Sequence, residues 1–532
     1  MVQKRWSGLI EGADPRVNPL TITGLVLLLG LVALAAHDLL QRHHAILRNF
    51  PIIGHLRFLL EMIGPELRQY IVTDNDQERP FSRDHRRWVY ASSKQENNYF
   101  GFGTDQDMEL APNYLIVKQT SFPLAPPVRS GPEHLPAAKV LGGDRGRRLA
   151  FRPPSAVNVS GMSFGALSAA AVIALNEGAG IAGCLHNTGE GGLTPHHRHG
   201  GDLIFQIGTG YFSCRDKDGR FDLPRLLETV ETAPVRAIEI KLSQGAKPGL
   251  GGVLPAAKVT LEIAAIRGVE LGRDCVSPSG HSAFHDVDSL LDFVEMIAQA
   301  TGMPVGIKSA VGDDEFWRDL AHLMATTDRG VDFITVDGGE GGTGAAPLAF
   351  SDHVSLPYKV GMSRVYRIFH EAGMAERVVF VGSGKLGFPD ASLLAFALGA
   401  DMINVGREAM LAIGCIQAQR CHTGRCPSGV ATQSRWLSRG LDPELKSVRL
   451  ASYVATLRHE ILQLTRACGR VHPALVGADQ LEILDGRFGS TTATEVFGYR
   501  MGWGLPSPGD QQAIQAIMAS GEAVSMPASV EH

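Results

Sequence analysis

The stretch AIEIKLSQGAKPGLGGVLPAAKVTLEIAAIRG, residues 237–268, contains the pattern that decides the fold. It opens with a short apolar run, AIEIKL (237–242), and passes through a glycine-rich segment. It ends in PAAKVTLEIAAIRG (255–268), which has the spacing of a helix. A buried strand followed by a helix is the unit from which parallel sheets are built. The glycines after the strand would let the backbone approach a ligand closely.

The same unit recurs from Ala156 onward, where apolar or β-branched runs alternate with helical patterns such as DSLLDFVEMIAQAT (288–301). Eight parallel strands are the number that closes a (β/α)₈ barrel, and we predict that fold, with an open doubly wound sheet as the alternative. Glycine-rich segments follow nearly every run, which places ligand contacts at the carboxyl ends of the strands. The eight runs are AVNVS (156–160), IAGCLH (181–186), LIFQI (203–207), AIEIKL (237–242), PVGIKS (304–309), DFITV (332–336), VVFVG (378–382) and MINVG (402–406).

The rest of the 532-residue chain is arranged around this region. Net charge is -5, with 50 basic and 55 acidic residues, so no nucleic-acid partner is expected. Seven cysteines are too few for a disulfide scaffold in a chain of this length. We predict a tail (1–19), a transmembrane helix (20–37), an irregular lead-in with an amphipathic helix (38–150), the barrel with a cysteine loop (151–440), a helical segment (441–510) that includes LKSVRLASYVATLRHEILQLTRACG (445–469), and a flexible tail (511–532).

The run LTITGLVLLLGLVALAA, residues 20–36, has no charged residue in its 17 positions and is near the minimum for crossing a bilayer. A buried core helix and a signal peptide are the alternatives, because Lys4 and Arg5 precede the run and Ala33-Leu34-Ala35 resembles a cleavage site. We expect an uncleaved single-pass anchor with a cytoplasmic barrel. The next apolar run, FPIIGHLRFLLEMI (50–63), predicts an amphipathic helix on the membrane face or against the barrel.

Three further motifs suggest other functions, but each is weak evidence. Gly161-Met162-Ser163-Phe164-Gly165 fits the hydrolase pattern G-x-S-x-G, which also needs an acid and a histidine later in the chain. Residues 339–344 fit G-x-G-x-x-G without the expected acidic residue at the end of a second strand. His196, His197 and His199 are interpreted as a solvated polar loop rather than a metal site.

Cys415, Cys421 and Cys426 lie within twelve residues, directly after the last predicted strand. Thiolates suit iron–sulfur clusters or zinc. Three of them fit a three-iron cluster, or a four-iron cluster with one open corner. With His422 they could instead form a Cys₃His zinc site. Free buried cysteines are the remaining reading.

The loop GCIQAQRCHTGRCPSGVATQ (414–433) resembles the three-iron cluster loop of glutamate synthases. Four further motifs resemble the same family in the same order, so the resemblance covers roughly residues 155–435. With the apolar run and the lead-in ILRNFPIIGHLRFLLEMIGPELRQY (46–70), the chain is most similar to short, membrane-anchored, FMN-binding proteins of that family. The four motifs are GMSFGALS (161–168), NTGEGG (187–192), KLSQGAKPGLGGVLP (241–255) and GGTGAAP (341–347).

The resemblance implies FMN, a [3Fe–4S] cluster, and reduction of an imine made from 2-oxoglutarate and ammonia. It assigns Cys415, Cys421 and Cys426 to the cluster and Lys308 to the negative side of the reduced flavin ring. It assigns Lys247 and Arg267 to the keto acid, and Glu190 with Lys247 to catalysis. An ion pair that shapes the loop is the other reading of Glu190. The other flavin residues it implies are Met162, Ser163 and Gln206, with Gly382, Ser383, Gly384, Gly406 and Arg407 at the phosphate.

The substrate motifs depart from the family where the flavin motifs do not. Val253 stands where the family has a glutamine, and SPSGHS (277–282) replaces a proline-rich segment. The chain shows no glutaminase or NAD(P)H domain, so we expect ammonia or an amine from solution or another subunit. We expect electrons from a donor protein, a reductase subunit or a free carrier. The alternatives are an FMN barrel oxidoreductase with another substrate and a membrane-bound FMN/iron–sulfur electron-transfer module.

Overall fold

The computed structural model describes residues 19–126 and 133–521 and divides into two compact units, Met1–Arg83 and Asp84–His532. The predicted N-terminal tail lies outside the described residues except for its last residue, and so does the end of the predicted C-terminal tail. The two units are described separately below.

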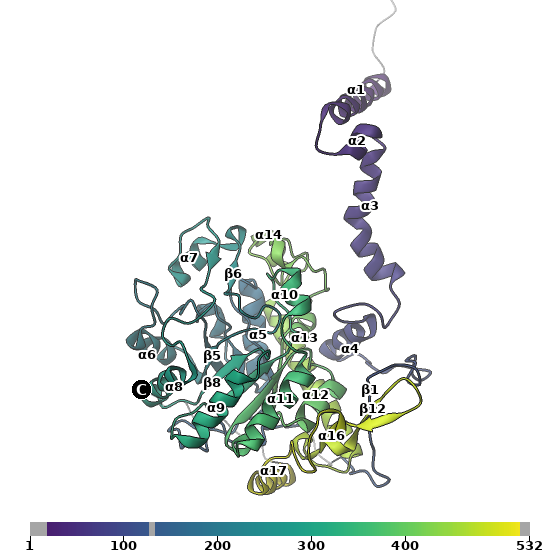
Figure 1. The fold of residues 1–532 in the computed structure, drawn as a ribbon. Helices are drawn as coiled ribbons and strands as arrows, with labels where there is room; N and C mark the ends of the chain where they lie inside the picture. The colour runs from purple at the N-terminus through teal and green to yellow at the C-terminus, as the bar shows by residue number, and fades with distance from the viewer. Residues whose placement is uncertain (1–18, 127–132, 522–532) are drawn as a thin grey trace, which may run out of the picture. The chain divides into compact units, whose positions relative to one another are not determined.

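Unit 2 contains a closed barrel of eight parallel strands, which confirms the (β/α)₈ prediction and excludes the open sheet. The strands occupy its centre in Figure 1, with helices around them. Each strand overlaps one of the eight predicted runs. Around the barrel the strands are β2 Val157–Val159, β3 His186–Asn187, β4 Leu203–Ile207, β5 Val235–Lys241, β8 Val305–Ser309, β9 Phe333–Asp337, β10 Val379–Ser383 and β11 Met402–Val405.

The predicted run 181–186 is wrong over most of its length, because only His186 belongs to a strand. The helix α5 (Ala169–Ala182) continues into the run and ends at Gly183, which adopts a left-handed conformation with φ of 61°. Small apolar residues suit a buried helix as well as a strand, so the glycine marks the boundary.

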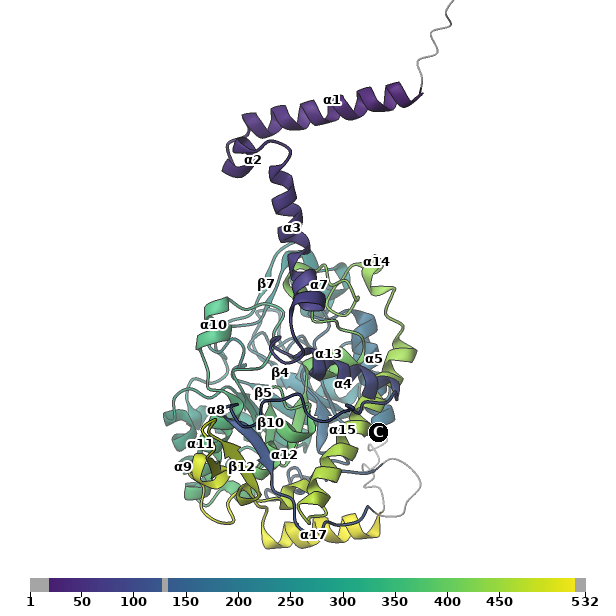
Figure 2. The ribbon, with the colours of Figure 1, turned by 90° about the vertical axis from the view of Figure 1, so that its right-hand side faces the viewer.

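Helices follow the strands along the chain and cover the outside of the barrel (Figures 1 and 2). After β2 to β4 the helices are α5, η2 Pro195–His197 and α6 Leu223–Glu231. Around β8 and β9 they are α8 Val287–Thr301, α9 Glu315–Thr326, α10 Leu348–His353, α11 Tyr358–Glu371 and η4 Ala375–Arg377. After β10 and β11 they are α12 Pro389–Ala397, α13 Arg407–Ala412, η5 Cys421–Thr423, α14 Arg435–Ser438 and α15 Pro443–Ala467.

An insertion between β5 and β8 rises above the carboxyl ends of the strands. It holds the antiparallel pair β6 (Val253–Leu254) and β7 (Cys275–Val276). The helical pattern predicted at 255–268 forms the short turn η3 (Ala256–Lys258) and the helix α7 (Leu261–Arg267). The insertion therefore lies on the side where a barrel of this kind builds its active site.

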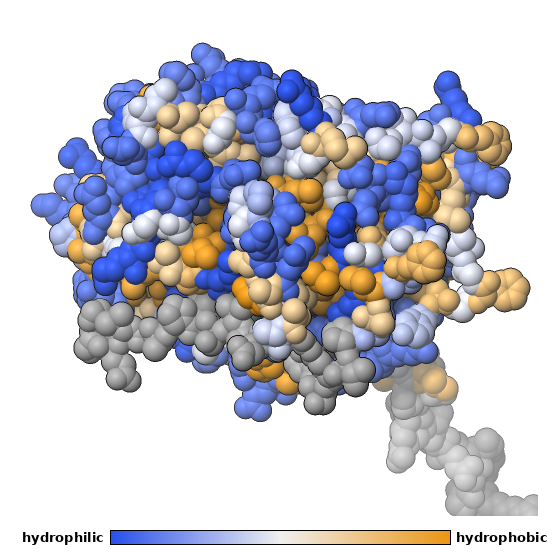
Figure 3. Space-filling view, turned by 90° about the horizontal axis from the view of Figure 1, so that it is seen from below, coloured by the Kyte–Doolittle hydropathy of each residue, from blue (hydrophilic) through white to orange (hydrophobic). Residues whose placement is uncertain are grey.

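The opposite end of the barrel is closed by the lead-in. Leu141 and Phe151 form an antiparallel bridge there and join a fully apolar cluster with Leu185, Ile204 and Phe333, which lie before or near the start of their strands. Figure 3 views unit 2 from this lower side, where hydrophilic side chains cover most of the surface with hydrophobic ones between them. The lead-in therefore closes the amino end of the barrel, and the insertion lies at the carboxyl end.

The C-terminal segment packs against the outside of the barrel. The helix α15 packs on α5 so closely that a Cβ at Gly178 would lie 2.6 Å from the Ser447 carbonyl oxygen, which explains a glycine there. Strand β1 (Tyr114–Val117) of the lead-in pairs antiparallel with β12 near the C-terminus. The tail predicted to be flexible from residue 511 is helical as far as Ser520. The last elements are η6 Pro473–Leu475, η7 Ala478–Gln480, β12 Leu481–Leu484, β13 Ser490–Thr492, α16 Ala493–Val496 and α17 Pro508–Ser520, and α4 Arg83–Lys94 opens the unit.

The described part of unit 1, residues 19–83, is built from helices and the segments that join them. The first, α1 (Pro19–Leu40), has 22 residues and extends beyond the predicted run at 20–36. Residues 22–40, with a mean hydropathy of 2.0, make it long and apolar enough to cross a membrane by length and composition. The short α2 (Ala45–Asn49), then α3 (Gly54–Leu67) and a π-helical turn η1 (Arg68–Val72) follow it.

Candidate active site

A buried carboxylate organises the inside of the barrel near the carboxyl ends of the strands. Glu239 of β5 is fully buried and accepts hydrogen bonds from Asn187 Nδ2 at 2.8 Å, Gln206 Nε2 at 2.6 Å and Thr335 Oγ1 at 2.6 Å. These donors come from β3, β4 and β9. A buried charge is tolerated when it is hydrogen-bonded in this way, and the network fixes the side chains around it.

Lys308 of β8 stands beside that network. Its Nζ lies 3.5 Å from Asp337 Oδ1, and both side chains are buried. Burial alone would lower the pKa of Lys308, but the carboxylates of Asp337 and Glu239 outweigh burial and raise it. The ammonium group therefore stays protonated at neutral pH. The two predicted flavin contacts Gln206 and Lys308 thus depend on one carboxylate, Glu239.

A second group of charged residues lies at the mouth of the barrel, that is, at the carboxyl ends of its strands. Glu190 Oε1 is 2.7 Å from Lys241 Nζ, and Lys247 Nζ donates to the Gly251 carbonyl oxygen at 3.0 Å. Burial would raise the pKa of Glu190, but Lys241 and Lys247, with a smaller contribution from Arg267, hold that pKa below its ordinary value. Burial together with the Lys241 charge lowers the pKa of Lys247, although Glu190 acts in the opposite direction. The structure therefore brings the two predicted catalytic residues together.

Lys241 was not predicted, although the sequence contains a signal for it. It is the last residue of β5 and the fifth residue of the run AIEIKL, in register with Lys308 on the neighbouring strand. A lysine at the carboxyl end of a barrel strand faces the place where ligands bind. Glu239 was also missed, because one acidic residue inside an apolar run does not reveal whether it faces the barrel interior.

The loop after β2 carries Met162 and Ser163. Met162 donates its N–H to the Asn187 carbonyl oxygen at 3.1 Å and accepts from His197 Nε2 at 3.0 Å. Gly189, with φ of 67°, lets this loop come close, since a Cβ there would lie 2.9 Å from Ser163 N. His197 is fully buried, and burial lowers its pKa to about 4. The predicted solvated loop is therefore wrong for His197, whereas His199 is exposed.

The predicted phosphate residues follow β10 and β11. Gly382 and Ser383 end β10, and Gly384 adopts a φ of 134° that other residues rarely take. Gly406 precedes α13, and Arg407 donates through Nη2 to the Glu340 carbonyl oxygen. A Cβ at Gly342 would lie 2.5 Å from Arg407 Cδ. Gly342 therefore makes room for the Arg407 side chain, whereas at Gly339, a glycine of the G-x-G-x-x-G pattern, a Cβ would lie 3.0 Å from the Ser355 carbonyl oxygen.

The three clustered cysteines lie on the loop after α13. Burial, with smaller contributions from the nearby Cys421 and Cys426, raises the pKa of Cys415 to about 12. Burial would also raise the pKa of Cys426, but hydrogen bonds from Ser428 and the loop backbone lower it. In the described chain the three sulfur atoms are not all within 4.8 Å of one another.

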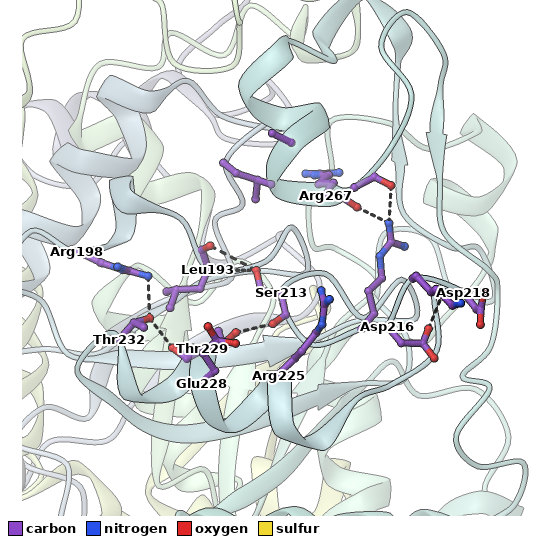
Figure 4. Close-up of a pocket in the computed structure, with 16 residues that line it drawn as sticks. Leu193, Arg198, Ser213, Asp216, Asp218, Arg225, Glu228, Thr229, Thr232 and Arg267 are labelled. Atoms are coloured by element: carbon purple, nitrogen blue, oxygen red, sulfur yellow. Dashed lines mark hydrogen bonds between the residues drawn. The ribbon is translucent and has the colours of Figure 1, made fainter. Parts of the chain in front are cut away.

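Arg267 of α7 lies beside the mouth, because its charge helps to lower the pKa of Glu190 and a Cβ at Gly191 would lie 2.8 Å from its Nη2. Its Nη2 donates to the Phe164 carbonyl oxygen at 3.0 Å, and its guanidinium faces the Phe212 ring at 5.1 Å. It also lines a cavity of about 690 Å³ between α6, α7 and the loop after β4 (Figure 4). Glu190, Lys247 and Lys308 do not line that cavity. Of the predicted substrate residues, Lys247 is therefore at the mouth and Arg267 supports the loop that carries Met162 and Ser163.

The barrel and its charged mouth define a (β/α)₈ enzyme. Residues 150–471 match the family model described as the conserved region in glutamate synthase. The glutamate synthase large subunit-like protein YerD of Bacillus subtilis (strain 168) is 37% identical over 464 residues, which cover 81% of this chain and 88% of that protein. The archaeal glutamate synthase (NADPH) of Methanocaldococcus jannaschii is 36% identical over 319 residues, which cover 59% of each chain. The chain belongs to the glutamate synthase family and is an oxidoreductase of that type.

Proposed function

We propose that this enzyme reduces an imine, formed from 2-oxoglutarate or a related keto acid and ammonia or an amine, to an amino acid. The observation that carries the proposal is the group of Glu190, Lys241 and Lys247 at the mouth, directly above the Gln206–Glu239–Lys308 network. The names of the relatives, glutamate synthase (NADPH) among them, support a keto acid, an amine and an electron donor.

The residues at the strand ends fit FMN. The Lys308 ammonium is held protonated by Asp337 and Glu239, so it can stabilise the negative charge of a reduced flavin ring. Gln206, Met162 and Ser163 line the same side, and Gly382, Ser383, Gly384, Gly406 and Arg407 offer backbone and guanidinium N–H groups for the phosphate. When bound, FMN supplies the hydride transfer.

The charged mouth would bind the keto acid and move protons. Lys247 supplies a cation for one carboxylate, and the N–H groups of Arg267 that do not bond Phe164 supply another. Glu190 is ionised at neutral pH and can take a proton from the amine as the imine forms. Because the pKa of Lys247 is lowered, that side chain can return a proton to the nitrogen.

Cys415, Cys421 and Cys426 would hold a [3Fe–4S] cluster, which passes single electrons between a donor protein or reductase subunit and the flavin. A buried thiol with a raised pKa is an unfavourable thiolate until a cation neutralises it. Lys258 adds a nearby positive charge, since its pKa responds to Cys421 and Cys426. In this proposal α1 is an uncleaved single-pass membrane anchor and the barrel is cytoplasmic, where thiols stay reduced.

Substrate-dependent reoxidation tests the function. The anaerobically reduced protein should return to its oxidised absorbance spectrum when 2-oxoglutarate and ammonium are both added, and not when either is omitted. With ¹⁵N-ammonium the product should be labelled glutamate by mass spectrometry. If a panel of keto acids fails while an artificial acceptor still reoxidises the protein, the chain is an electron-transfer module instead.

A related substrate is favoured by one observation at the mouth. Val253 is 41% exposed and pairs across the β6–β7 hairpin with Val276, which is also exposed. Val253 follows Gly252, where a Cβ would lie 3.0 Å from Glu190 Oε1. An apolar pair so near the carboxylate suits a keto acid or amine that carries an alkyl group. The keto-acid panel with several amines decides between this substrate and 2-oxoglutarate.

A further inference from the structure

Within unit 1, hydrogen bonds fix the turn that joins α1 to α3, and this turn is called the elbow below. Asp38, near the end of α1, is fully buried, and its carboxylate accepts the Ile52 N–H at 2.9 Å. His55 Nε2, from α3, lies 3.0 Å from both Asp38 oxygens. The Gln41 side chain also bonds the turn, donating to the Asp38 and His44 carbonyl oxygens and accepting from the His44 N–H. Because a buried carboxylate is stable only when it is hydrogen-bonded, these contacts fix where α3 leaves α1.

The elbow directs α3 crosswise to α1 instead of along the same line (Figures 1 and 2). An α-helix of 22 residues is about 33 Å long, close to the roughly 30 Å of a bilayer core. If α1 crosses the bilayer, its end lies at the surface, and α3 begins there and runs along that surface. The pinned geometry leaves α3 little freedom to continue into the lipid.

The helix α3 carries an exposed apolar stripe along one face. Its members are spaced by three or four residues, and Leu56 and Leu60 are 59% and 60% exposed. The flank beside the stripe is charged, since Arg57 Nε and Glu61 Oε1 form an ion pair at 2.9 Å there, and Met62, which is 60% exposed, lies on the far side. The stripe consists of Leu56, Leu59, Leu60, Ile63 and Leu67.

We propose that α1 and α3 form an L-shaped membrane anchor, in which α3 lies in the plane of the bilayer with its stripe in the boundary between headgroups and acyl chains. A helix with one apolar and one charged face binds in this position. The bilayer is favoured over a protein partner because α3 is fixed to the end of the helix that would span it. This inference does not depend on the reaction that the barrel performs.

Tryptophan placed along the stripe tests the proposal in the full-length protein. Leu56→Trp, Leu60→Trp and Leu67→Trp each add a fluorophore on the stripe, and Arg57→Trp is the matched control on the charged face. The proteins are reconstituted into vesicles of phosphatidylcholine with bromine atoms at a shallow or a deep acyl position. Fluorescence added over the parent protein, which has five tryptophans of its own, is compared with that in unbrominated vesicles.

All three stripe variants should lose most of the added fluorescence to the shallow bromines, and to a similar extent. The control should instead be quenched by aqueous iodide. Quenching that deepens steadily from position 56 to position 67 would mean that α3 inserts and does not lie in the plane. Protection of the stripe variants from both bromine and iodide would place α3 against the barrel or a second copy. Either result overturns the proposal.

Discussion

At the scale of single residues, the proposed function divides the charged residues of the barrel into a group for the cofactor and a group for the substrate. Gln206 and Lys308 are tied to Glu239, whereas Glu190 and Lys247 belong to the charged group above it. Substitutions in the two groups should therefore give different defects, and one pair of variants can tell them apart.

Arg267→Ala should leave FMN and iron content unchanged and reduce kcat/KM for the keto acid. Loss of a buried charge-assisted contact is worth about 2–4 kcal/mol, or about 30- to 1000-fold. Lys308→Ala should weaken FMN retention or shift the flavin potential with any substrate. Steady-state kinetics and flavin titration measure both effects.

The control for Arg267→Ala is Arg267→Lys, which keeps a cation but loses the fork that can bind both Phe164 and a carboxylate. If Arg267→Ala leaves keto-acid turnover unchanged while Lys308→Ala abolishes flavin retention, the cofactor assignment survives and the dicarboxylate assignment fails. Arg267 would then be a support for the Phe164 loop only.

Val253→Gln probes the pocket beside Glu190. Val253 is exposed in a two-stranded hairpin, so the change should cost little stability. We expect it to raise kcat/KM for 2-oxoglutarate and to lower it for the native substrate, because a polar side chain replaces an apolar contact. Competition between two keto acids in one assay measures the ratio. An unchanged ratio would remove Val253 from the substrate pocket.

Buried histidines make stability depend on pH. Burial lowers the pKa of His472 to about 4, as it does for His197, while both should titrate near 6.5 when unfolded. Between these values the unfolded chain binds more protons, so the free energy of unfolding should fall as pH drops from about 6.5 to about 4, by at most roughly 3 kcal/mol for each histidine. His472→Gln should flatten the curve in urea unfolding at several pH values. His43→Gln, on an exposed residue, should not.

Sequence patterns predicted most of the candidate residues at the mouth but not the residues that these contact. Glu190 and Lys247 follow strands, and Gln206 and Lys308 lie near the ends of strands. A closed barrel brings strand ends together wherever they occur in the chain. The Phe164 contact of Arg267 could not be foreseen, because it depends on how the loop after β2 folds over α7. The burial of His197 could not be foreseen either, because the sequence HHRH (196–199) does not indicate which ring faces inward.

At the scale of elements, the cysteine loop offers the clearest test. Protein purified without oxygen should contain about three irons and acid-labile sulfide per chain. Cys421→Ser should lose the cluster and lower the thermal stability of the loop, because a ligated site contributes folding free energy. Cys468→Ser, a buried cysteine after α15, is the control and should keep the iron. Stoichiometric zinc without sulfide would contradict the cluster.

Strand positions were predictable because β-branched runs stop at glycines, as LIFQI shows by coinciding with β4. The boundary between α5 and β3 was not predictable from periodicity, since both sides are small and apolar. The lead-in contains an ordered apolar cluster around Leu141 and Phe151 that closes the amino end of the barrel. This role is apparent only in the folded barrel, where the starts of the strands surround the cluster.

At the scale of the whole molecule, attachment to the membrane can be measured directly. Full-length protein should sediment with membranes and need detergent for release, because α1 exposes an apolar surface along its length. A truncated chain that starts near residue 40 should be more soluble and keep its cofactors. Protease should digest the barrel from the cytoplasmic side. A mature N-terminus at Ala36 would show that the run is a cleaved signal.

The pairing of β1 with β12 has a consequence for how the protein is made. Val117 meets Leu481, so 364 residues separate the partners along the chain. A ribosome that adds about 5–20 residues per second needs roughly 20–70 s to make that length. Until then β1 is an open strand edge on a nascent chain, available to any neighbouring polypeptide. Synthesis of this protein should therefore depend on chaperones that shield the segment around residue 115, and ribosome pausing late in the message should favour aggregation over folding.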